Sequence, residues 1–147
     1  MTLSPSHLQA FRSLLEAHAR LLVALDDRFR DREISLTFYD VLVHLSEAPD
    51  RRLRMQELAQ RVLLSKSGLT RLVDRMEQGN LVRREASDRD ARGINAVLTD
   101  HGLATLEAAV PAHRQDLVDL VSSVIDEREA DELAELLGRI RDRALED

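Results

Sequence analysis

Residues 55–98 hold two short helical segments in tight succession, followed by two strand-like runs around a polar tip. MQELAQRV (55–62) predicts the first helix. Only LL and the cap residue Ser65 separate it from a second helix, KSGLTRLVDRMEQ (66–78), which we expect to end at Gly79-Asn80. LVRRE and GINAVL predict two strands joined by ASDRDAR. A tight helix pair followed by a two-stranded hairpin predicts a winged helix-turn-helix.

The second helix of this pair is apolar on one side and polar on the other. Leu69, Leu72, Val73 and Met76 follow the i, i+3, i+4, i+7 spacing of a buried stripe. Hydroxyl groups can reach phosphates or base edges, and Arg can bind guanine with paired hydrogen bonds. We therefore expect this helix to lie in the major groove of DNA. Its candidate DNA-binding residues are Ser67, Thr70 and Arg71 on the polar side, Lys66 in the first turn, Arg75 toward the side, and Ser65, which is an N-cap first and a phosphate donor second.

The hairpin gathers arginines although the chain is acidic. The 147 residues carry a formal net charge of -6, but residues 51–100 hold 11 basic and 7 acidic side chains between two acidic ends. This distribution predicts that only the middle of the chain meets a polyanion, although a high-GC coding bias would also enrich arginine. Arg89 and Arg92 can enter a minor groove, with Gly93 letting the chain turn behind them. Arg84 on the first strand is another candidate contact, and we expect Asp90 to support Arg92 or the wing.

Longer amphipathic helices flank this segment. Ser4-Pro5 predicts the start of a helix that runs to about Asp31, and a second helix follows Ser35 and ends before Pro49. We expect Thr99 to cap a helix over residues 100–125, kinked near Pro111, and Asp126 with Glu129 to form a capping pair for a last helix. Leu53 and its neighbours are too short a run to assign alone, although they fit a very short strand.

Several classes of function are disfavoured by what the chain lacks. The sequence has no cysteine, which excludes disulfides, thiolate nucleophiles, cysteine zinc sites and thiol redox sensing. It has no membrane-length apolar run and no signal-peptide pattern, so we expect a cytoplasmic protein. Asp88 and Asp90 mimic the start of a calcium loop, but Arg92 occupies the third ligand position. We expect no metal, no cofactor and no enzymatic activity, because no catalytic motif is recognisable.

Residues 64–102, LSKSGLTRLVDRMEQGNLVRREASDRDARGINAVLTDHG, resemble the multiple-antibiotic-resistance regulator (MarR) family of bacterial transcription factors. The family's wing signature, Asp-x-Arg and then Leu-Thr-x-x-Gly, matches Asp90, Arg92, Leu98, Thr99 and Gly102. SLTFYDVLVHLSEAP is similar to the family's second helix, and Ala96 departs from the usual Val. The resemblance covers nearly the whole chain.

This resemblance implies a mainly α fold with a small β wing, in a single domain over residues 1–147. Residues 34–98 would form the winged helix-turn-helix module, and residues 1–33 and 99–147 would be dimerisation helices. The implied function is that of a sequence-specific repressor that binds a palindromic operator on double-stranded DNA as a homodimer and responds to a small-molecule effector of unknown identity. His44, His113 and Tyr39 are candidate effector-binding residues, with ordinary core or interface positions as the alternative.

Two other classes of function stay open from the residues alone. A helical protein-interaction module could present the arginine hairpin to an acidic partner protein, and it would show no preference for duplex DNA. An enzyme would need a buried group of perturbed titratable side chains, which one sequence does not reveal.

Overall fold

The computed structural model describes residues 1–62, 68–88 and 92–146. Its contacts divide the chain into two compact units, Met1–Pro111 and Ala112–Asp147. These units reflect contacts within one chain. They do not test the prediction that residues 1–33 and 99–147 are dimerisation helices and residues 34–98 the DNA-binding module, which stays a prediction. No helix among the described residues is both long and apolar enough to cross a membrane.

The first unit begins with two capped helices. Helix α1 spans Pro5–Phe29, and Ser4 caps it by accepting a hydrogen bond from the amide of His7. Helix α2 spans Leu36–Glu47, with Ser35 as its N-cap and Ala48 as its C-cap. The predicted cap Ser4 and the predicted start of the second helix after Ser35 are confirmed, and α1 ends two residues before the expected boundary. A 3-10 turn over Pro49–Arg51 (η1) then leads into the sheet.

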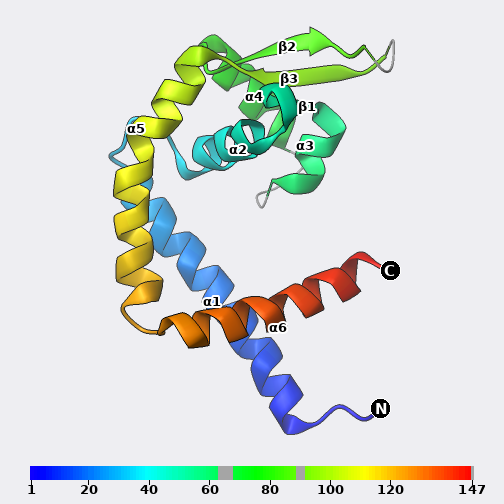
Figure 1. Ribbon diagram of the computed structural model, residues 1–147, viewed down its shortest axis with the longest axis vertical. Coiled ribbons are helices and arrows are strands. Elements are labelled where there is room, and N and C mark those ends of the chain that lie inside the picture. Colours follow the sequence, from blue (N-terminus) through cyan, green and yellow to red (C-terminus); the bar gives the residue numbers. More distant parts are fainter. Residues whose placement is uncertain (63–67, 89–91, 147) are drawn as a thin grey trace. The chain divides into compact units, whose positions relative to one another are not determined.

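The hairpin is part of a small three-stranded antiparallel sheet (Figure 1). Its strands are β1 (Arg52–Arg54), β2 (Val82–Ala86) and β3 (Ile94–Leu98), in the order β1-β3-β2. The run around Leu53 is therefore a genuine strand, since it pairs with β3 from Arg52↔Val97 to Arg54↔Asn95. The alternation of Ile94, Ala96 and Leu98 in the sequence predicts that one face of this strand is buried. Ala96 and Leu98 are buried, whereas Ile94 is 47% exposed.

Helices α3 (Met55–Arg61) and α4 (Leu69–Gln78) form the predicted tight pair. Helix α4 is described from Leu69, with Gly68 as its N-cap, and the expected start at Lys66 and the expected cap Ser65 lie outside the described residues. Leu69, Val73 and Met76 are buried as predicted and pack into a core with side chains of α2, α3 and the sheet. The apolar stripe thus fixes which side of α4 faces outward.

Helix α4 ends in a reversal that places Asn80, rather than Gly79, in the left-handed region. The φ of Asn80 is 56°, whereas that of Gly79 is −79°. The amide of Leu81 donates to the carbonyl of Met76 and that of Asn80 to Glu77, which is the pattern of a Schellman motif. The helix therefore stops where the sequence indicated, but with Asn in the position usually taken by Gly.

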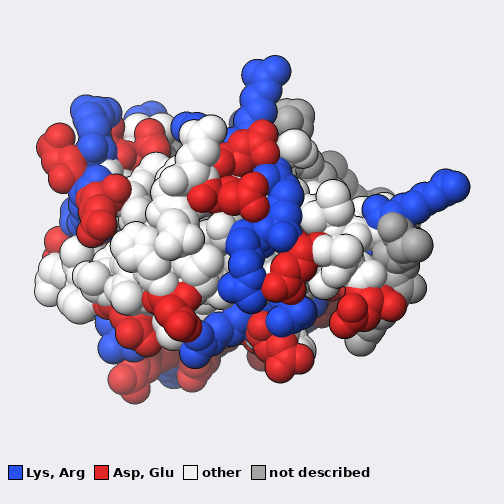
Figure 2. Space-filling model, turned by 90° about the horizontal axis from the view of Figure 1, so that it is seen from above, with Lys and Arg blue, Asp and Glu red and all other residues white. Residues whose placement is uncertain are grey.

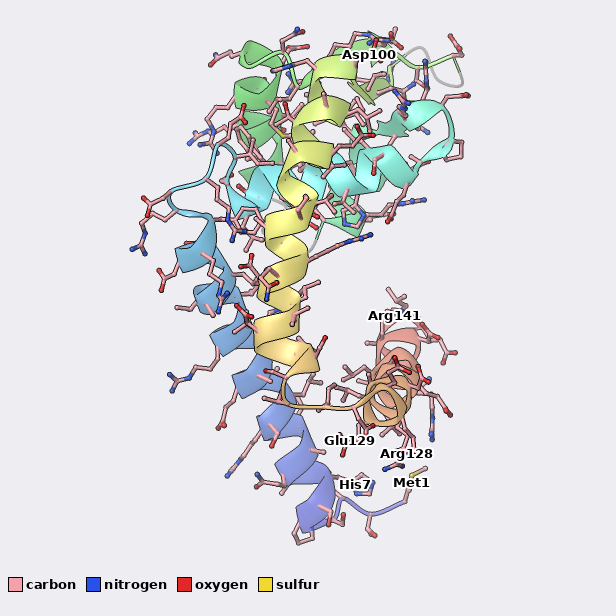
Figure 3. All side chains as sticks on the ribbon, turned by 60° about the vertical axis from the view of Figure 1, so that its left-hand side comes forward. Met1, His7, Asp100, Arg128, Glu129 and Arg141 are labelled. Atoms are coloured by element: carbon pink, nitrogen blue, oxygen red, sulfur yellow. The ribbon has the colours of Figure 1, made fainter. Side chains whose placement is uncertain are left out.

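Helix α5 spans Asp100–Leu117 and continues as a short π-helical segment over Val118–Ser122 (η3). The regular α-helix is thus shorter than the predicted 100–125, with Pro111 inside it. Helix α6 spans Glu127–Leu145, and Asp126 with Glu129 forms the predicted capping box. Asp100 and Glu129, labelled in Figure 3, mark the first turns of α5 and α6.

Candidate nucleic-acid interface

The polar side of α4 is open to solvent. Thr70 and Arg71 are exposed, and the side chain of Asp74 is 53% exposed. The same helix buries Leu69 and Val73 on its other side, so core packing holds its outer side chains in place. A rigid helix with exposed hydroxyl and guanidinium groups can enter a DNA major groove.

A cleft of about 410 Å³ lies between α4 and the wing. Thr70 of α4 and Arg84 of β2 line one part of it, and Arg92 and Ile94 at the return of the hairpin line another. Arg54, Met55 and Gln56, at the start of α3, complete the lining with Gly93. The fold thus gathers three arginines from separate segments around one open concavity, which suits a phosphate-bearing polymer.

Gly93 has a different role from the one the sequence suggested. No described glycine has a positive φ, so Gly93 does not supply a left-handed turn. A Cβ on Gly93 would instead lie 3.0 Å from Nη2 of Arg54 and 3.1 Å from Cβ of Ser87. The missing side chain leaves room for Arg54 beside the wing.

The arginines of β2 form ion pairs with acidic neighbours. Arg84 donates to Asp74 at 2.8 Å, to Glu77 at 3.2 Å and to the carbonyl of Thr70 at 3.1 Å. Arg83 donates to Glu85 at 2.9 Å, and Arg52 of β1 reaches the same carboxylate at 3.0 Å. On the face seen in Figure 2, basic and acidic side chains are interleaved rather than separated into one basic patch.

Arg75 lies beside an aromatic ring of α2. Its Cζ atom is 5.6 Å from the ring centroid of Phe38, a cation-π distance. Its side chain is exposed, so this contact orients Arg75 without burying it. The other predicted DNA-binding residues Ser65, Lys66, Ser67 and Arg89, together with the wing-support residue Asp90, lie outside the described residues.

The three candidate effector residues have partners within the chain. His44 Nε2 lies 3.2 Å from a carboxylate oxygen of Asp40, and the Tyr39 ring packs edge-on against Phe29 with centroids 5.5 Å apart. His113, in the second unit, lies 3.8 Å from Asp116. Within the first unit, Phe29 lines a cleft of about 350 Å³ with Asp26, Arg30, Arg32, Ser35 and Leu36.

The sequence interpretation missed two sets of residues at this interface. Arg54 and Gln56 line the cleft, but neither was a candidate DNA-binding residue, because nothing local in the sequence indicates that β1 pairs with β3. The acceptors of Arg84 were also missed. The spacing of Thr70, Asp74 and Glu77 on one helical side was a usable signal, since i, i+4 and i+7 side chains align along a helix.

The fold and this surface define a winged helix-turn-helix protein, with α4 in the position of a recognition helix and β2–β3 as the wing. No group of three or more His, Asp or Glu side chains suited to a metal occurs among residues 1–62, 68–88 and 92–146.

Comparison with known proteins gives the family. The model of the MarR family matches residues 34–93. The HTH-type transcriptional repressor YetL of Bacillus subtilis is 30% identical over 136 residues, which are 92% of this chain and 81% of the relative. The chain belongs to the MarR family and is a transcriptional regulator rather than an enzyme.

Solved structures agree with this assignment. AbsC, a MarR family transcriptional regulator from Streptomyces coelicolor, is 33% identical and has a TM-score of 0.85, covering 100% of this chain and 99% of its own. Sco3205 from the same organism, solved in complex with DNA, is also 33% identical, with a TM-score of 0.82 over 96% of this chain and 89% of that one. The resemblance and the fold class predicted from the sequence are confirmed.

Proposed function

We propose that this chain is a sequence-specific repressor that binds a pseudo-palindromic operator on double-stranded DNA as a homodimer. The observation that carries the proposal is the arrangement of α4, whose buried stripe leaves Thr70 and Arg71 exposed beside a cleft lined by Arg92. The relative Sco3205, similar over 96% of this chain, was solved in complex with DNA, which supports the same use of this surface here.

Exposed apolar stripes support the homodimer. Leu8, Phe11 and Leu15 are 44–58% exposed on α1 at helical spacing, and Leu133, Leu136 and Ile140 are 46–55% exposed on α6. A monomeric protein rarely leaves such stripes in water, because burying each side chain is worth about 2 kcal/mol. A second copy of the chain would cover them and present two α4 helices to one face of the duplex, with half-sites about one helical turn apart.

Regulation by a small-molecule effector is part of the proposal. The cleft at the α1–α2 junction is lined by Phe29, Arg30 and Arg32, and Asp26 also lines it. The Phe29 ring packs edge-on against Tyr39, and Arg32 lies over it with Cζ 4.6 Å from the ring centroid. Guanidinium groups beside an aromatic side chain suit a small anion. Tyr39→Ala should abolish the thermal shift that such a ligand produces while DNA binding without ligand persists.

Fluorescence anisotropy on the duplex upstream of the protein's own gene tests the DNA-binding proposal. Affinity should exceed that for a shuffled duplex of the same length, and it should fall steeply as salt rises because bound counterions are released. Equal affinity for both duplexes would contradict sequence-specific binding. If the hairpin instead binds an acidic partner protein, neither duplex will bind at moderate ionic strength.

A further inference from the structure

We propose that Arg84 is a positioning residue, which holds the recognition helix α4 against the first wing strand and neutralises carboxylates of that helix, instead of binding a DNA phosphate itself. The inference rests on the proposed function, since it assigns how the DNA-binding surface is held. It also revises the sequence interpretation, in which Arg84 was a candidate DNA contact.

Arg84 contacts α4 at three points along one side of the helix. Its guanidinium donates to the carbonyl of Thr70 at 3.1 Å, to Asp74 at 2.8 Å and to Glu77 at 3.2 Å. Its backbone amide also donates to Glu77 Oε2 at 2.9 Å. These bonds span about two turns of α4, so they resist both sliding and rotation of the helix relative to β2.

The register of the sheet directs Arg84 toward α4. Arg84 lies opposite Ala96 in the β2–β3 pair, and directly opposed residues project from the same face of a sheet. Ala96 is fully buried, so this face is the one that packs on the core. The side chain of Arg84 is only 21% exposed, less than half the exposed fraction of Asp74.

The charges on α4 explain why such a residue is needed. Asp74 follows Thr70 by four residues and Arg71 by three, so its carboxylate lies on the side of the helix proposed to meet DNA. An uncompensated carboxylate there would repel phosphates. The guanidinium of Arg84 lies 2.8 Å from a carboxylate oxygen of Asp74 and 3.2 Å from one of Glu77, and its positive charge offsets theirs.

Arg83 is the matched control. It lies on the same strand, carries the same charge and forms one ion pair with Glu85, yet it makes none of the bonds to α4 that Arg84 makes. Arg83→Gln and Arg84→Gln therefore change the net charge equally, and only the second breaks the link between strand and helix.

Thermal unfolding of the free protein, at one fixed protein concentration, is the first measurement. Arg84→Gln should lower Tm by about 3 °C, and Arg83→Gln by less than about 1 °C. Glu77→Gln should lower Tm less in the Arg84→Gln background than in the wild type, because the guanidinium–carboxylate pair is already lost while the bond from the backbone amide of residue 84 remains. Arg84→Lys should recover only part of the loss, since an ammonium cannot span all three acceptors. Equal Tm values for the wild type and Arg84→Gln, or additive losses in the double variant, would overturn the proposal.

The salt dependence of binding to the upstream duplex is the second measurement. Each phosphate contact contributes about 0.9 to the slope of log K against log salt. Arg84→Gln should weaken binding severalfold and leave this slope unchanged, whereas a slope reduced by about 0.9 per subunit with no change in Tm would show that Arg84 binds phosphate. If the wild type binds no duplex, the proposed function fails, and the unfolding series still decides whether Arg84 holds α4.

Discussion

The backbone of Gly102 lies directly against the carbonyl group of Leu81. A Cβ atom on Gly102 would sit 2.0 Å from that oxygen, well inside contact distance. Thr99 holds the two segments together. Its Oγ1 accepts a hydrogen bond from the Gly102 amide at 2.9 Å, and its hydroxyl donates to the carbonyl of Asn80 at 2.6 Å. The Leu-Thr-x-x-Gly motif therefore joins the start of α5 to the end of α4.

Gly102→Ala should lower the free energy of unfolding by about 3 kcal/mol, because backbone atoms rather than a flexible side chain must move to admit the methyl group. Urea denaturation measures the change. Gly138→Ala is the control: its nearest heavy atom would be Arg141 Nη2 at 3.8 Å, so alanine should stabilise α6 by about 0.5–1 kcal/mol. Similar effects of the two substitutions would contradict the close approach at Gly102.

Asn80→Ala should destabilise the protein by about 1 kcal/mol, because alanine disfavours the left-handed conformation that Asn80 adopts. Gly79→Ala should have little effect or stabilise slightly, since Gly79 has a negative φ and its nearest Cβ contact would be 3.6 Å. Chemical denaturation of both variants distinguishes them. The opposite order would mean that Gly79 carries the turn.

Phe11→Glu should convert the protein to monomers, because it places a charge at the centre of the exposed apolar stripe of α1, where Phe11 is 58% exposed. Gln9→Glu adds the same charge on another side of the helix and should leave the dimer intact. Light scattering coupled to gel filtration gives the mass of each variant. A wild type that is already monomeric would refute the homodimer.

Arg92→Ala should weaken binding to the upstream duplex about tenfold or more, because Arg92 lines the cleft between α4 and the wing. Arg71→Ala should have a comparable effect, with a lower salt slope if its contact is to phosphate. Arg114→Ala, in α5 and outside the cleft, removes the same charge and should change the affinity by less than about twofold. An equal loss in all three variants would point to net charge alone.

Local sequence signals located most of the helices. Ser4, Ser35 and Asp126 are caps because a side-chain oxygen accepts from an amide three residues on, and that geometry depends on a few adjacent residues. The end of α5 was less predictable, because an apolar pattern continues through residues 118–125 while the backbone changes to a π-helical segment.

The candidate site was predictable in its parts but not in their connections. The two sides of α4 follow from helical periodicity, so Thr70 and Arg71 could be placed on its outer side. The partners of Arg84 depend on strand register, because a shift of one residue would turn its side chain to the opposite face of the sheet. No pattern within β2 shows that Arg84 rather than Arg83 faces α4.

The sequence by itself determined that this chain is a helical winged helix-turn-helix protein, since periodicity, capping residues and the wing motif act over short distances along the chain. Only the tertiary structure decided which arginines form ion pairs with carboxylates, and that the backbone of Gly102 lies against the carbonyl of Leu81. Those outcomes depend on atoms brought together from distant segments, where packing and electrostatics act through space rather than along the chain.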